Sequence, residues 1–185
     1  MLDNFVLFAR PWWVNLLIII PFAAYYFWWN KLDVSKKTLL VAGIFGLAFG
    51  FVETAVVVYL RSLGYLPGSV AAVAYIHRSG TLYLSKNFLA IEAVRNAATI
   101  VMLICVALLA EKNRRERWAV FLWTFAFWDL FYYFGLYLLI GWPKSLTTPD
   151  VLFLIPSPWY SQVWFPLLVS GLTVLAVLAG RRKRE

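Results

Sequence analysis

Five long apolar runs constrain this chain more than any other feature of its sequence. They cover residues 12–29, 38–60, 88–110, 118–140 and 162–180. A membrane hydrocarbon core of ~30 Å is crossed by ~20 helical residues, so each run is long enough, or nearly long enough, to span it. With 63% hydrophobic and 14% charged residues, the chain is also too apolar for an ordinary soluble domain. The sequence therefore predicts a single all-α domain over residues 1–185, a polytopic membrane protein with a bundle of five transmembrane helices.

The basic residues of the connections are unevenly divided between the two predicted sides of the membrane. Eleven lie in the 30–37 and 111–117 connections and in the C-terminal tail, and five lie on the opposite side. Because cytoplasmic loops are enriched in Lys and Arg, the C-terminus is expected in the cytoplasm and the N-terminus outside. The chain does not start like a cleaved secretory signal, so 12–29 is interpreted as a retained span. The net charge of +8 then indicates topology and anionic lipid rather than a nucleic-acid partner.

The two connections that face outward in this arrangement, 61–87 and 141–161, are rich in aromatic residues. In the second, Thr148 is typical of a helix N-cap, and the proline that follows is typical of a first helical residue. The pattern predicts a short helix in the membrane interface between Asp150 and Pro158. This segment is either a lid over the bundle or only an interfacial anchor, and the sequence leaves both open.

Four ionisable residues lie inside predicted spans rather than in connections: Glu53, Glu92, Arg95 and Asp129. Each costs at least ~2.5–3.5 kcal/mol at mid-membrane, so each is expected to have a partner or a role. At 1.5 Å per residue they lie roughly 6–16 Å below the outer boundary, which places all of them in the outer half of the bilayer.

The helical faces of these residues favour one polar cluster. The glycines at 43, 46 and 50 precede Glu53 at helical spacing, which predicts that Glu53 faces another helix. Spacings of three and four residues group the polar side chains of the third and fourth spans in the same way. Within the cluster, Arg95 is expected to hold Glu92 and at least one of the other acids. The candidate ligand-binding residues are Glu53, Glu92, Arg95, Asn96, Thr99, Asp129, Tyr132 and Tyr133.

A purely structural interpretation of these charges stays open beside the functional one. Glu92 and Arg95 alone are well explained as an ion pair that holds the bundle together. In this interpretation Asp129 is satisfied by Arg95 or by a tyrosine hydroxyl. For the whole set a functional role is favoured, because three acids against one arginine leave net negative charge in a low-dielectric place. Either an acid is protonated there or a cation is bound.

Three kinds of chemistry fit such a cluster. Glu53, Glu92 and Asp129 offer carboxylates to a metal ion, with His77 of the outer connection as a weaker ligand. A haem held by two histidines is excluded because His77 is the only histidine. An apolar ligand, such as a quinone, a polyprenyl or a lipid headgroup, would be bound by Arg95 and the tyrosines. The third possibility is a proton or ion pathway through the acids.

The sequence thus predicts a membrane-embedded binding protein, with or without catalysis, whose pocket opens outward. One alternative is a structural or accessory subunit of a larger membrane complex, and another is a component of a proton- or ion-conducting transporter. The expected partners are the lipid bilayer and either other membrane subunits or further copies of the chain. Cys105, the single cysteine, is interpreted as a small buried residue.

A resemblance extends over most of the chain beyond the first span. It is carried by "GFVETAVVVYLR" (50–61), "EAVRNAAT" (92–99), "FWDLFYY" (127–133), "GWPKSL" (141–146) and "VLFLIPSPW" (151–159). With these segments the chain resembles a family of small, uncharacterised integral membrane proteins of bacteria. The resemblance implies a stand-alone polytopic protein, expected in the bacterial cytoplasmic (inner) membrane. It implies no activity, no cofactor and no catalytic residue.

Overall fold

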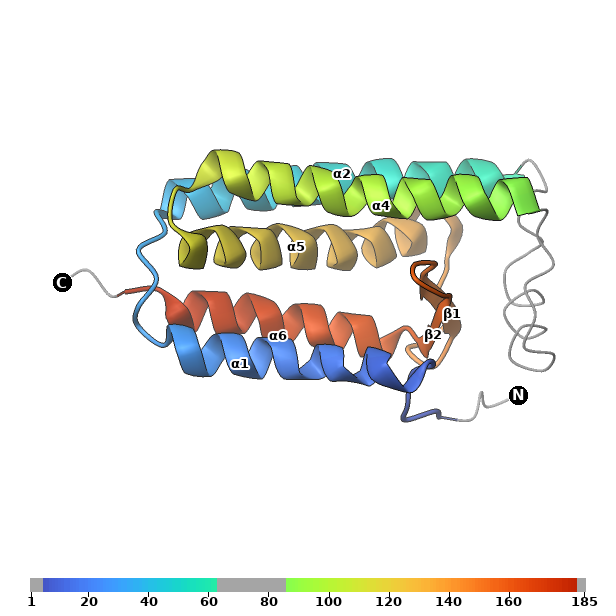
Figure 1. Ribbon diagram of the computed structural model, residues 1–185. Coiled ribbons are helices and arrows are strands. Elements are labelled where there is room, and N and C mark those ends of the chain that lie inside the picture. Colours follow the sequence, from blue (N-terminus) through green and yellow to red (C-terminus); the bar gives the residue numbers. More distant parts are fainter. Residues whose placement is uncertain (1–4, 63–85, 183–185) are drawn as a thin grey trace.

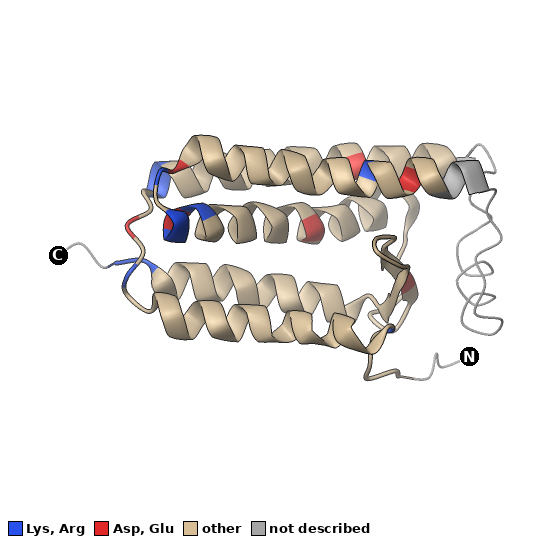
Figure 2. Ribbon diagram, viewed as in Figure 1, with Lys and Arg blue, Asp and Glu red and all other residues tan. Residues whose placement is uncertain are grey.

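A computed structural model describes residues 5–62 and 86–182 of the chain. Within these ranges the protein is mostly helical, and Figure 1 shows its helices lying side by side along one common direction. One end of the bundle carries the turns at 29–35 and 111–113, and Figure 2 shows that most Lys and Arg residues lie there. We call it the basic end. The opposite end carries two short strands and is called the hairpin end.

Among the described residues, three helices are long and apolar enough to cross a membrane: α2 (Lys36–Ser62), α4 (Lys86–Ala110) and α5 (Arg114–Ile140). The start of α2 is capped by Ser35, whose Oγ accepts a hydrogen bond of 2.9 Å from the backbone N–H of Thr38. The end of α5 is set by Gly141, which adopts the left-handed conformation with φ 64°. Glycine is the residue that tolerates this helix-ending geometry best.

The first and last apolar runs form shorter helices. The first begins as a 3-10 helix, η1 (Trp12–Ile18), and continues as α1 (Ile19–Trp28). Pro21 falls in the first turn of α1, where the hydrogen bond lost by proline is tolerated. The last run forms α6 (Trp164–Gly180). Both are apolar but shorter than the three long helices.

The helix α5 lies at the centre of the bundle, where it contacts α2, α4 and α6, and α1 packs on α6. The closest approach is between α2 and α5. A Cβ atom added to Gly46 would lie 2.7 Å from the carbonyl oxygen of Thr124, and one added to Gly50 would lie 2.6 Å from that of Trp128. The glycine stripe predicted on this helix is therefore a helix contact, and Glu53 is buried as expected.

The 141–161 connection differs from the prediction, because it contains a hairpin instead of a short helix. Strands β1 (Pro149–Phe153) and β2 (Trp159–Gln162) pair antiparallel, and Arg10 forms an isolated bridge to Tyr160. The physical reason is twofold. A helix between Asp150 and the following prolines would complete fewer than two turns, which is too short to be stable. The valine and aromatic side chains of this segment instead favour a strand.

Candidate functional site

The polar residues of α2 and α4 meet in an ion network towards the hairpin end. Arg95 of α4 forms an ion pair with Glu53 of α2. It also donates hydrogen bonds from Nε and Nη2 to Oε2 of Glu92, at 3.1 and 2.6 Å. Thr99 donates to Oε1 of Glu53 at 2.8 Å. Arg95 therefore contacts two acids, as the sequence predicted, and we call Glu53, Glu92, Arg95 and Thr99 the ion network.

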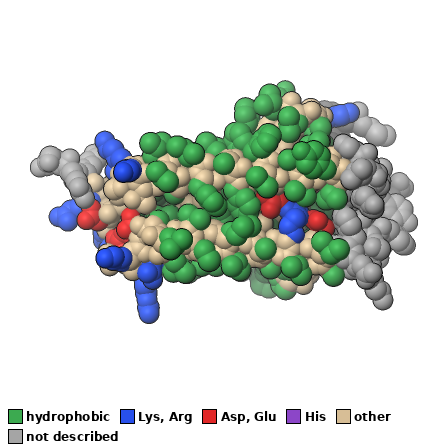
Figure 3. All heavy atoms as spheres, turned by 90° about the horizontal axis from the view of Figure 1, so that it is seen from above, with side chains coloured by type: hydrophobic (Ala, Val, Ile, Leu, Met, Phe, Trp, Pro, Cys, Tyr) green, Lys and Arg blue, Asp and Glu red, His purple; other side chains and the backbone are tan. Residues whose placement is uncertain are grey.

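The ion network opens towards the side of the bundle. The side chains of Glu53, Glu92 and Arg95 are 7%, 13% and 27% exposed, respectively. Exposed apolar residues lie beside them on the same two helices, among them Ile91 of α4 and Val52 of α2. Figure 3 views this face and shows one basic patch between two acidic ones, with hydrophobic side chains along both flanks and towards the basic end. The network is thus a polar site set in an apolar outer surface.

Asp129 does not join this network. Its Oδ2 atom accepts a hydrogen bond of 2.7 Å from the hydroxyl of Ser170 in α6. Within the described residues, neither Arg95 nor a tyrosine hydroxyl bonds to it. The expectation that Asp129 completes the cluster is therefore corrected: its side chain turns towards α6 rather than towards α4. Ser170 was not selected from the sequence, although a polar residue within the last apolar run is a signal for a helix contact.

A second cluster forms where α5 meets the hairpin. The hydroxyl of Tyr133 donates a hydrogen bond of 2.8 Å to Oδ2 of Asp150 in β1. The guanidinium carbon of Arg61, near the end of α2, lies 4.6 Å from the ring centre of Trp142. This distance is typical of a cation–π contact. We call Arg61, Tyr133, Trp142 and Asp150 the hairpin cluster. Of these four, only Tyr133 was among the residues selected from the sequence.

Burial controls the protonation of Asp150, which is 8% exposed. Loss of hydration raises the pKa of this carboxyl from its ordinary value of 3.8 to about 6. The hydrogen bond from Tyr133, a backbone hydrogen bond from Val151 and the charge of Arg61 act in the opposite direction. The hairpin therefore carries an acid that titrates in mildly acidic solution.

Two residues selected from the sequence connect the clusters. Asn96 of α4 accepts a hydrogen bond of 3.0 Å from the backbone N–H of Leu154, which lies in the turn of the hairpin. Tyr132 lies within electrostatic range of Arg61 and Arg95. The hairpin thus contacts α4 at Asn96, the residue next to Arg95. A displacement of the hairpin would therefore displace this part of α4, and the reverse.

The candidate metal ligands are not gathered into one site. Glu53 and Glu92 are both bonded by Arg95, and Asp129 lies at the contact with α6. Across residues 5–62 and 86–182, no three His, Cys, Asp or Glu residues lie close enough to hold a metal ion. His77 lies outside the described residues. The arrangement of Glu53 and Glu92 therefore favours ion pairing with Arg95 over metal coordination.

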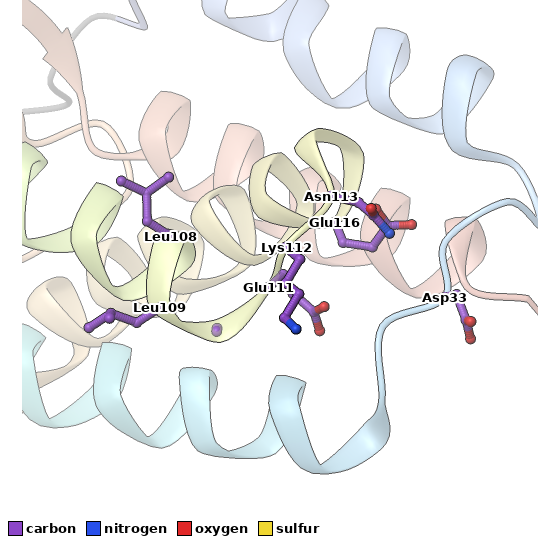
Figure 4. A pocket seen from close by; sticks show the side chains of 8 residues that line it. Asp33, Leu108, Leu109, Glu111, Lys112, Asn113 and Glu116 are labelled. Carbon is purple, nitrogen blue, oxygen red and sulfur yellow. The ribbon is translucent and has the colours of Figure 1, made fainter.

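A depression of about 590 Å³ lies at the basic end and is unrelated to the two clusters (Figure 4). Its acids include Glu116, which belongs to the first turn of α5, where the helix dipole favours negative charge. The helix dipole therefore accounts for Glu116 at this position, and no bound ligand is needed to explain it. The lining residues are Asp33, Leu108, Leu109, Ala110, Glu111, Lys112, Asn113 and Glu116.

Comparison of the chain with family models, with curated proteins and with solved structures found no match. The chemistry proposed for the ion network and the hairpin cluster therefore rests on their own geometry. In that geometry, the distinguishing feature is that the ion network faces the side of the bundle. A network that opened to water at the end of the bundle would instead have indicated a water-soluble ligand.

Proposed function

We propose that the chain is an integral membrane protein with five transmembrane helices, which binds a lipid-like amphiphile at the ion network. The two shorter helices are compatible with five spans. Seven 3-10 residues at ~2.0 Å and ten α-helical residues at ~1.5 Å give η1 and α1 a combined length of ~29 Å. The 17 residues of α6 give ~26 Å. Both lengths approach the ~30 Å of a hydrocarbon core.

The proposed orientation has the basic end in the cytoplasm and the hairpin end outside, in a bacterial inner membrane. Its support is the concentration of Lys and Arg at the basic end, visible in Figure 2, because such residues are retained on the cytoplasmic side. In this orientation the ion network lies in the outer half of the bilayer. The hairpin then covers the bundle at the outer boundary.

The observation that carries the function is the sideways opening of the ion network within an apolar surface. In a bilayer, hydrocarbon chains surround that surface. Ionised side chains next to hydrocarbon are disfavoured by several kcal/mol unless polar groups cover them. The polar head of an amphiphile would supply those groups, while its chain would lie along exposed side chains of α4 such as Met102 and Leu109, which share the helical face of Arg95. An amphiphile therefore satisfies both the charges and the surface around them.

A second candidate is an accessory subunit of a membrane complex. It is favoured by the low coverage of α4, of which 17% of the most apolar window is buried, against 50% for α5. A helix of another protein would cover the same face. In this case the ion network would contact a polar residue of that helix.

The two functions are distinguished by what the purified protein retains. The wild type is extracted in native lipid nanodiscs, and its bound molecules are measured by native mass spectrometry. Arg95→Leu combined with Glu92→Leu removes one charge of each sign from the network. The matched control, Lys112→Leu combined with Glu111→Leu, makes the same change at the basic end.

An amphiphile retained by the wild type and the control, and lost from the double variant of the network, supports the proposal. Retention of the same molecule by all three would contradict it. A wild type that is stable only with another protein bound, and carries no amphiphile, supports the accessory subunit instead.

A further inference from the structure

The ion network carries an excess of negative charge. Glu53 and Glu92 supply two carboxylates, and Arg95 supplies one guanidinium. Among the described residues, no other Lys or Arg side chain forms an ion pair with either acid. A negatively charged headgroup would therefore be repelled. The network instead favours a ligand that brings a positive charge into this low-dielectric surface.

One carboxylate oxygen of the network has no hydrogen-bond donor among residues 5–62 and 86–182. Oε1 of Glu53 accepts from Thr99, its Oε2 pairs with Arg95, and Oε2 of Glu92 accepts from Arg95 twice. Within the described part of the chain, no hydrogen bond reaches Oε1 of Glu92. Glu92 also lies three residues, or ~4.5 Å, nearer the hairpin end than Arg95. The open acceptor thus lies on the side nearer the proposed outer boundary, where headgroups lie.

We infer that the ligand is an amphiphile with a primary ammonium group, which binds at Glu92 while its hydrocarbon chain lies along α4. This inference rests on the proposed function and specifies its ligand class. A primary ammonium carries a positive charge and three N–H donors, and so complements both the excess charge and the open oxygen. A quaternary ammonium carries the charge without a donor. The exposed side chains of Met102 and Leu109, which follow Arg95 at seven-residue spacing on the same face of α4, offer the apolar surface that the chain needs.

The test uses photoreactive amphiphiles of one chain length with three heads: a primary amine, an alcohol and a carboxylic acid. Wild-type protein is reconstituted in nanodiscs of phosphatidylcholine, labelled with each probe, and digested for mass spectrometry. We expect labelling of residues 91–104 by the amine to exceed labelling by the alcohol by about tenfold, because a hydrogen bond to a charged group discriminates by about this factor. An unlabelled alkylamine should compete with it, whereas the matching alkyltrimethylammonium should compete weakly.

Two variants locate the effect. Glu92→Gln removes the charge and should lower the amine labelling about tenfold to the level of the alcohol. Glu111→Gln removes a carboxylate at the basic end and should leave the labelling unchanged. Equal labelling of α4 by all three probes would overturn the ammonium inference while leaving an amphiphile site in place. Absence of labelling of α4 above that of other lipid-facing helices would overturn the proposed function as well. The competition experiment needs no variant, so it decides the question even if Glu92→Gln does not fold.

Discussion

Arg95 and Glu53 form an ion pair that joins α4 to α2 within an apolar face of the bundle. Towards the basic end, α4 is anchored differently, by the buried apolar residues Leu103 and Ala107. The part of α4 nearer the hairpin end thus depends on polar contacts, which are Arg95 and Thr99 to Glu53 and Asn96 to the hairpin. Polar contacts of this kind can be exchanged for contacts to a ligand more readily than packed apolar side chains can.

Replacement of Arg95 by leucine is expected to destabilise the protein by a few kcal/mol. The change leaves Glu53 and Glu92 close together without their shared cation, and removal of one partner of a buried ion pair has an effect of this size. The melting temperature in detergent or nanodiscs measures it. Arg114→Leu, an exposed position at the basic end, is the control and should change the free energy of unfolding by less than about 0.5 kcal/mol. A wild-type melting temperature for Arg95→Leu would show that the ion network does not hold α4.

The addition of Glu92→Leu to Arg95→Leu is expected to recover part of the lost stability. The double variant has one carboxylate fewer than Arg95→Leu alone, so the remaining acid no longer repels a second one. A double-mutant cycle of melting temperatures, with each single variant measured separately, gives the coupling energy of the pair. Additive effects of the two substitutions would mean that the contact between Glu92 and Arg95 contributes nothing.

The contact between α2 and α5 is expected to reject any side chain at Gly50. A Cβ atom there would lie 2.6 Å from a backbone oxygen of α5, which cannot move aside as a flexible side chain would. Gly50→Ala should therefore separate the helices and destabilise by about 1–3 kcal/mol. Gly171 of α6 provides the matched control, because nothing lies within 4 Å of its added Cβ. Gly171→Ala should leave the melting temperature unchanged or raise it, since alanine is the better helix former. Equal losses at both sites would contradict the close-contact explanation.

The sequence predicted the helices and the pair of Arg95 with Glu92 because both depend on local spacing. Long apolar runs specify spans, and residues three or four apart on one helix share a face. Asp129 shows where this reasoning ends. Its depth was predictable from its position along α5, but its partner Ser170 is 41 residues away. The rotation of α5 against its neighbours decides which helix faces Asp129, and no spacing within α5 encodes that rotation.

The hairpin shows a second limit. Thr148 and the proline after it have the character of a helix start, and this local signal was followed although the segment beyond is too short for a stable helix. In the structure, Thr148 instead accepts a hydrogen bond of 3.1 Å at its Oγ1 from the backbone N–H of Ser145. Two short runs of β-prone residues separated by prolines were the better signal. Asp150 could be assigned to a site only after the strand brought it to Tyr133.

The proposed orientation predicts opposite accessibility for two exposed lysines. Lys37 lies at the basic end and Lys144 lies in the connection that leads to the hairpin. Cys105 is exposed on α4 rather than buried as the sequence suggested, so it is first replaced by serine. A membrane-impermeant maleimide should then label Lys144→Cys in intact cells, and Lys37→Cys only after permeabilisation. The reverse pattern would invert the topology, and labelling of both from outside would mean an even number of spans between them.

The stability of the protein is expected to fall as the pH rises from about 4 to about 6. The pKa of Asp150 is raised from 3.8 to about 6 in the folded protein, mainly because burial disfavours its charged form. The folded state therefore binds this proton more tightly than the unfolded state does. The stability that comes from this tighter proton binding is complete below the pKa of Asp150 in the unfolded state. It is lost as the pH rises past the pKa of Asp150 in the folded state. At 1.36 kcal/mol per pKa unit, the loss amounts to about 3 kcal/mol.

Two substitutions separate Asp150 from the other acids in this titration. Asp150→Asn keeps the shape of the side chain and removes its proton equilibrium, so this part of the decline between pH 4 and 6 should disappear. Tyr133→Phe removes the 2.8 Å hydrogen bond that favours the carboxylate form, so the midpoint of the decline should move to higher pH. Both are measured as melting temperatures from pH 4 to 8 in the same detergent. A decline in Asp150→Asn as steep as that of the wild type would assign the titration to another group. An unchanged midpoint in Tyr133→Phe would mean that its hydroxyl has no influence on Asp150.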